Sequence, residues 1–151
     1  LFYSLPKGFE TRVYFDTHAS EDASAINNAS IFLGHKGDSG RFGLEYNSLG
    51  NARNYKSSAD GYNRDGFSIY GSKKLSNNYE LFARYDQISS NILSGESNAW
   101  NYNNDGSLLM FGAQYQAVKG VKFNLNYRLF NHDNSVINNK SILSLNAEFK
   151  I

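Results

Sequence analysis

The feature that most constrains the fold is an alternation of apolar and polar residues at every second position, which recurs along the whole chain. A period of two places successive side chains on opposite faces of an extended strand. The alternation is strong at 9–16, 41–47, 79–86, 121–129 and 143–151, and weaker at 29–33, 67–72 and 109–116. No segment has the period of an amphipathic helix. The sequence therefore predicts an all-β protein with eight antiparallel strands.

The connections between these strands alternate in length. The segments 17–28, 48–65, 88–106 and 131–140 are long and rich in Asn, Ser, Asp and Gly, whereas 35–40, 74–78 and 117–120 are short. Transmembrane barrels have short turns at the periplasmic end and long loops at the extracellular end. The pattern predicts an antiparallel transmembrane β-barrel, a single domain over residues 1–151.

Composition excludes several other classes of protein. The chain has no Cys, which excludes disulfides, thiolate metal sites and a cysteine nucleophile. Lys and Arg number 15 against 14 Asp and Glu, and this near-balance argues against a nucleic-acid partner. The longest apolar run, 108–111, is far shorter than the roughly 20 residues that a spanning helix needs.

We expect the apolar faces to meet lipid and the polar faces to line the lumen, because in lipid only a closed ladder satisfies the backbone. Charges of both signs on the polar faces would then neutralise one another across the lumen. The alternative is that the polar faces form an ordinary surface in contact with solvent. The predicted lumen-lining residues are Glu10, Arg12, Tyr14, Asp16, Arg41, Glu45, Glu80, Arg84, Gln114, Lys122, Asn126, Arg128, Asn146 and Glu148. The predicted lipid-facing residues are Phe9, Val13, Phe15, Leu44, Leu81, Tyr85, Phe111, Phe123, Leu125, Tyr127, Leu143, Leu145 and Phe149.

Aromatic residues bracket the apolar face of several strands. The pairs are Phe9 and Phe15, Phe42 and Tyr46, Tyr79 and Tyr85, and Phe123 and Tyr127. Such spacing would form two girdles, one at each membrane interface. The alternative is that these rings form the core of a soluble sandwich or of a lipocalin-like carrier. In that case the apolar faces would point inward and the polar faces would meet water.

The C-terminal half resembles a known family. The stretches "YELFARYDQISSN", "GAQYQAVKGVKFNLNYRLFNHDN" and "SILSLNAEFKI" resemble the final strands of bacterial porin-like outer-membrane proteins. They are most similar to the porin type of Bacteroidetes-like bacteria, related to the phosphate-selective group. These barrels usually end in Phe, whereas Lys150 and Ile151 follow Phe149 here. No phosphate ladder maps onto this chain, so phosphate selectivity is not carried over.

The resemblance implies an integral protein of the outer membrane of a Gram-negative bacterium. Its partners would be outer-membrane lipid and lipopolysaccharide, small hydrophilic solutes, and other outer-membrane proteins or further copies of itself. The function it implies is a porin-type channel for passive diffusion of small hydrophilic solutes or ions.

The N-terminal segment leaves the size of the barrel open. "SLPKGFETRVYF" has the same layout as the turn and strand "QAVKGVKFNLNY", so residues 1–5 would end a preceding strand of a larger barrel of about 16 strands. Alternatively, 1–8 is a periplasmic lead-in to a complete eight-stranded barrel. Side chains fill a barrel that small, so it would have a structural, adhesive or partner-binding role through its extracellular loops.

Little in the chain could carry other chemistry. The three histidines lie far apart in the sequence, without a ligand at metal spacing. Residues 101–106 have the opening spacing of a calcium loop, but Gly112 stands where the bidentate Glu belongs. No nucleophile has an identifiable base. We therefore predict no metal, no cofactor and no enzymatic activity.

Overall fold

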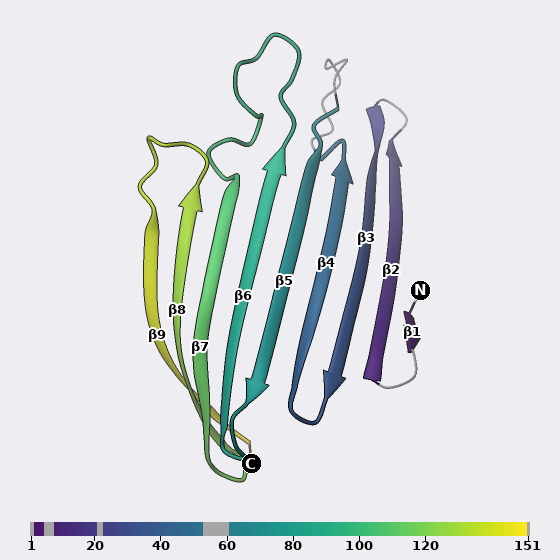
Figure 1. The fold of residues 1–151 in the computed structure, drawn as a ribbon. Helices are drawn as coiled ribbons and strands as arrows, with labels where there is room; N and C mark the ends of the chain where they lie inside the picture. Colours follow the sequence, from purple (N-terminus) through teal and green to yellow (C-terminus); the bar gives the residue numbers. More distant parts are fainter. Residues whose placement is uncertain (1, 5–7, 21–22, 53–60, 151) are drawn as a thin grey trace.

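The computed structural model describes residues 2–4, 8–20, 23–52 and 61–150 and shows one antiparallel sheet (Figure 1). Its strands are β1 (Phe2–Ser4), β2 (Phe9–Ser20), β3 (Ala23–Gly37), β4 (Gly40–Gly50), β5 (Arg64–Lys74), β6 (Tyr79–Ser90), β7 (Gly106–Val118), β8 (Val121–His132) and β9 (Lys140–Phe149). The eight predicted strands correspond to β2–β9, which confirms the all-β prediction. No helix among the described residues is long and apolar enough to cross a membrane.

Each strand pairs with the next one along the chain, so the sheet is a meander with the order β1 to β9. The short strand β1 pairs with β2, with Phe2 opposite Arg12. The edge strands β1 and β9 lie on opposite sides of the sheet (Figure 1), and no ladder joins them among the described residues. The sheet is therefore a curved, open wall.

The loops sort by length, as predicted, at three of the four expected positions. The connections β4–β5, β6–β7 and β8–β9 lie at one end of the sheet, called here the long-loop end (Figure 1). The turns β3–β4, β5–β6 and β7–β8 lie at the opposite, short-turn end. Residues 21–22, 53–60 and 5–7, which fall in connections, lie outside the described residues.

The prediction of a long loop over 17–28 was wrong. Strand β2 continues to Ser20, strand β3 begins at Ala23, and the ladder between them pairs Thr17 with Asn27. The register shifts between His18 and Ser20, as at a β-bulge. The two faces of this part of the hairpin do not differ in polarity, since Thr17 and Asn27 lie on the apolar side of the sheet and Ile26 on the polar side, so it has no alternation from which a strand could be predicted.

The ladder brings the apolar positions of all the long strands onto one side of the sheet. Directly paired residues share a face, and the pairs Val13–Ile31, Ile31–Tyr46 and Tyr46–Phe67 show how this apolar face passes from strand to strand. All thirteen residues predicted to face lipid lie on it, and all fourteen predicted lumen residues lie on the opposite, polar face. What each face meets remains a prediction.

In a water-soluble protein apolar side chains are buried and polar ones are exposed, whereas this sheet shows the reverse. The described residues include no buried hydrophobic side chain, and the buried side chains are Ser68, Asp105 and Asn126. On the apolar face Phe15 is 69% exposed and Leu145 is 74% exposed. The polar face carries the buried side chains of the sheet, and the apolar face carries most of its exposed large hydrophobic side chains.

Aromatic rings gather near both ends of the apolar face. Toward the short-turn end, Tyr79 stacks on Tyr115 with 4.7 Å between ring centroids, and Phe9 lies 4.5 Å from the His35 ring. Nearer the long-loop end, the Tyr46 hydroxyl donates to Asp65 Oδ1 at 2.8 Å. Amphipathic rings with one polar contact are typical of a boundary between an apolar layer and water.

We predict that Gly106, the first residue of β7, is the glycine least tolerant of a side chain. Its φ is +140°, and a Cβ would lie 2.1 Å from the Asn131 carbonyl oxygen. Gly106→Ala should lower the free energy of unfolding by about 1–3 kcal/mol, measured by urea titration of the folded protein in detergent. Gly71→Ala is the control, because its Cβ would meet nothing closer than 3.8 Å. Equal stability of the two variants would contradict the prediction.

Candidate functional site

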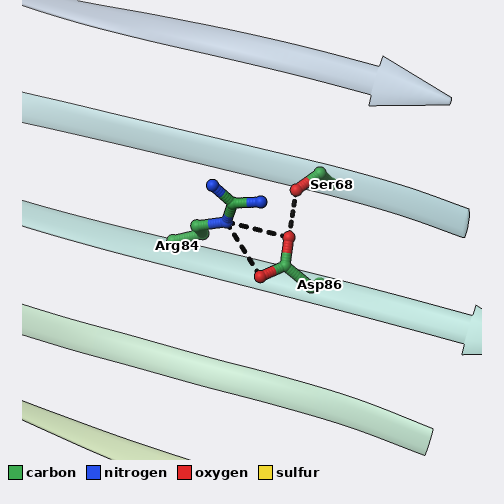
Figure 2. A network of polar contacts seen from close by, with 3 residues as sticks. All are labelled: Ser68, Arg84 and Asp86. Atoms are coloured by element: carbon green, nitrogen blue, oxygen red, sulfur yellow. Dashed lines mark hydrogen bonds and ion pairs between the residues drawn. The ribbon is translucent and has the colours of Figure 1, made fainter. Parts of the chain in front are cut away.

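The polar face carries a charged network on two adjacent strands, β5 and β6 (Figure 2). Arg84 Nε donates to both carboxylate oxygens of Asp86, at 2.9 Å and 2.8 Å, and the Ser68 hydroxyl donates to Asp86 Oδ1. Arg84 and Asp86 lie two residues apart on one strand, so both point to the same face. Ser68 joins them because the ladder places it directly opposite Asp86.

This network is partly shielded from solvent. Ser68 is 8% exposed, and the side chains of Asp86 and Arg84 are 21% and 46% exposed. Charge-assisted hydrogen bonds of this kind are stronger than bonds between neutral groups. The terminal nitrogens of Arg84 have no hydrogen-bond partner among the described residues. They are positioned to contact water or a solute in front of the wall.

Other charges on the polar face are paired along and across strands. Arg41 Nη2 lies 3.8 Å from Glu80 Oε1, a contact that spans from β4 to β6 over the small Ser72 of β5. On β2, Arg12 Nη2 lies 3.4 Å from Glu10 Oε1. These pairs are of the kind that the predicted mutual neutralisation requires. The Ser72 hydroxyl is buried and has no hydrogen-bond partner in the part of the chain that the structure describes.

A second, separate chain of polar side chains lies on β8. Asn126 Nδ2 donates to Asn124 Oδ1 at 2.8 Å, and Arg128 Nε donates to Asn126 Oδ1 at 3.1 Å. Asn126 is 4% exposed, so its amide orients Arg128 from a covered position. Arg128 and Arg84 both pair with Met110 across the ladder and therefore lie on one row.

Two rings also lie on this face, between the charged groups. Phe32 stacks on Tyr70 with 6.4 Å between centroids and an interplanar angle of 13°, and the Arg12 guanidinium lies 5.4 Å from the Phe32 centroid. The rings lie over Gly43, where a Cβ would come within 2.3 Å of the Tyr70 ring.

The sequence analysis identified most of this site but not its connections. Arg84, Asn126 and Arg128 were predicted to line the lumen, and the structure places them on one face with hydrogen-bond partners. Gln114 and Asn146 share that face, but no hydrogen bond joins either side chain to another described residue. Ser68, Asp86 and Asn124 were not among the predicted lumen-lining residues, although their alternation with Ile69, Tyr85 and Leu125 places them on the polar face.

At the long-loop end a single carboxylate organises the connections. Asp105 is 1% exposed and accepts hydrogen bonds from Ser90 N–H at 3.0 Å, from the Ser90 hydroxyl and from Asn101 Nδ2 at 3.1 Å. Its own carbonyl accepts from Asp133 N–H at 3.0 Å. Asp105 therefore ties the β6–β7 connection to the end of β6 and to the β8–β9 connection.

The neighbouring loop is attached to this assembly. Trp100 Nε1 donates to the Asn63 carbonyl at 2.8 Å, and the Trp100 ring meets Tyr62 edge-on with centroids 5.4 Å apart. Asn63 N–H donates to Asn91 Oδ1 at 2.7 Å. The described parts of the β4–β5 and β6–β7 connections thus form one ordered rim.

Residues 101–106, which have the opening spacing of a calcium loop, belong to this rim. The Asp105 carboxylate is occupied by donors from Ser90 and Asn101, as in a hydrogen-bonded turn. Among the described residues there is no group of three or more His, Cys, Asp or Glu side chains that could hold a metal ion.

Comparisons with known proteins bear on the fold. No protein-family model matches the chain, and no curated protein sequence matches it. A solved structure of the NanC porin is similar, with a TM-score of 0.69, 14% sequence identity, and coverage of 99% of this chain and 76% of that chain. At this identity the likeness shows the fold alone: the antiparallel sheet has the fold of part of a porin-like β-barrel, and it is open among the described residues.

We predict that Asp105→Ala releases the β6–β7 connection, because Ser90 and Asn101 lose their shared acceptor. Each buried group left without a partner costs about 1–3 kcal/mol. Limited proteolysis with chymotrypsin should then cut the folded protein at Trp100 or Tyr102 faster than in the parent. Asp133→Ala is the matched control, since its exposed side chain has no hydrogen bond to the described residues. Unchanged cutting in Asp105→Ala would show that the carboxylate does not hold the loop.

Proposed function

We propose that this chain forms the wall of a porin-type β-barrel in the outer membrane of a Gram-negative bacterium. The barrel allows passive diffusion of small hydrophilic solutes or ions along the polar face. The observation that carries the proposal is the inverted distribution of polarity: exposed side chains such as Leu143 and Leu145 on one face, and paired charges on the other.

The apolar face would be unfavourable in water. Soluble proteins rarely expose apolar patches of more than a few hundred Å², whereas here the large exposed residues follow one another across eight strands. Lipid removes that penalty, and the antiparallel ladder satisfies the backbone groups within it. Membrane lipid and lipopolysaccharide are accordingly the proposed partners of this face.

The polar face suits a water-filled lumen. Its ion pairs are only partly shielded, and Arg84 and Arg128 present guanidinium groups on one row. Charged side chains along a pore set a preference for cations or anions without binding one solute tightly. We therefore propose weak selectivity by charge.

Conductance in planar lipid bilayers tests the channel directly. A diffusion channel should give stable steps that scale with salt concentration. A closed barrel acting through its extracellular loops, the alternative, should insert without steps. The intact mass of the protein extracted from membranes gives the number of strands, since a mass near 17 kDa corresponds to this chain alone.

We predict that Asp86→Asn shifts the ion preference toward anions. The substitution removes a negative charge from the polar face and leaves Arg84 without its partner. The reversal potential in a KCl gradient should move in the anion-selective direction. Asp65→Asn is the matched control, because Asp65 lies on the apolar face beside Tyr46. If both variants shift the potential equally, the two faces are assigned wrongly.

We predict that adding a lysine destabilises the protein on the apolar face but not on the polar face. Leu125→Lys and Leu145→Lys should each lower the free energy of unfolding in lipid vesicles by roughly 2–4 kcal/mol, the cost of Lys near the midplane. Asn146→Lys, the position next to Leu145 on the polar face, should change it little. Insensitivity at Leu125 and Leu145 would overturn the proposal that lipid covers the apolar face.

A further inference from the structure

A groove crosses the apolar face in the half nearer the short-turn end. Its volume is about 970 Å³, within the range of ligand sites. Small residues form its floor, and rings form much of its walls. The floor residues are Gly71, Ala83 and Ala113, and the wall residues include Phe42, Phe111 and Tyr127.

The groove is continuous across neighbouring strands because of the register. Gly71 pairs directly with Ala83, and Ala113 pairs with Leu81 and Leu125. Small side chains therefore meet between strands, while longer ones stand on either side. The lining is overwhelmingly apolar, so it suits hydrocarbon rather than a sugar or a nucleotide.

The end of the groove is basic. Lys73 lines it, and no ion pair or hydrogen bond joins the Lys73 ammonium to another described residue. The three turn regions 36–41, 73–80 and 117–122 together contain six Lys and Arg residues against two Asp and Glu residues. The described long-loop segments 48–52, 61–65, 87–107 and 131–141 contain two against four. Positive charge is thus concentrated at the end where the groove lies.

We propose that the groove holds an acyl chain of a phospholipid whose anionic headgroup lies at Lys73. The apolar lining meets the chain, and the ammonium, on a flexible stem, reaches the phosphate at the membrane boundary. The excess of Lys and Arg over Asp and Glu in the turn regions favours a lipid with net negative charge over a zwitterionic one. The lipid belongs to the leaflet at the short-turn end.

This inference goes beyond the proposed channel. It requires lipid on the apolar face but does not depend on conduction. A protein that does not insert into vesicles would refute the membrane placement itself. A protein that inserts and conducts but shows no preference among lipids would refute only this inference.

The test is native mass spectrometry of the whole protein in detergent, with phosphatidylglycerol or phosphatidylcholine added at equal concentration. We expect retention of one phosphatidylglycerol in preference to phosphatidylcholine. Lys73→Gln should weaken the phosphatidylglycerol adduct about fivefold, the share expected of one lysine. Lys140→Gln, at the long-loop end, is the matched control and should not. Equal retention of both lipids, or equal effects of both variants, would overturn the inference.

A second pair of variants tests the groove itself. Ala83→Phe fills the floor and should abolish the adduct, whereas Ala147→Phe adds the same ring to the apolar face outside the groove and should retain it. Far-ultraviolet circular dichroism shows whether both variants are folded. Inorganic phosphate at millimolar concentration should not displace the lipid. Displacement, or retention of the adduct in folded Ala83→Phe, would show that the acyl chain does not lie there.

Discussion

The whole structure depends on one uninterrupted antiparallel ladder. Each strand pairs with its neighbour in sequence, so the backbone groups between β2 and β9 find their partners within the sheet. The ladder also decides the facing of every side chain, because a slip of one residue would exchange the two faces of a strand. The register that aligns Val13, Ile31 and Tyr46 therefore keeps the apolar face continuous.

That continuity explains where polar and apolar groups can be placed. With no buried hydrophobic side chain among the described residues, burial of apolar groups in a core does not hold the sheet together. The covered groups are instead polar, and two of the partly covered carboxylates have a charged partner: Asp86 pairs with Arg84, and Glu80 with Arg41. At the long-loop end, Ser90 and Asn101 donate hydrogen bonds to the buried Asp105 carboxylate. These hydrogen bonds order the rim.

Sequence alone could predict the strands wherever their two faces differ in polarity. Strand β8 alternates from Val121 to Leu129 and was predicted with nearly its observed bounds. The hairpin around Thr17 and Asn27 was predicted as a loop, because its two faces do not differ in polarity and so give no period to detect. The backbone ladder continues there all the same.

The amino-acid sequence by itself determined the all-β class, the alternation of long and short connections, and which residues share a face within each strand. These follow from local geometry, since a period of two acts on neighbours along the chain. Only the tertiary structure decided which strands are adjacent and in what register. It therefore decided that Ser68 meets Asp86, that Arg41 reaches Glu80 over Ser72, and that Asp105 is buried. Such contacts depend on residues far apart in the chain, whose relative positions no local pattern encodes.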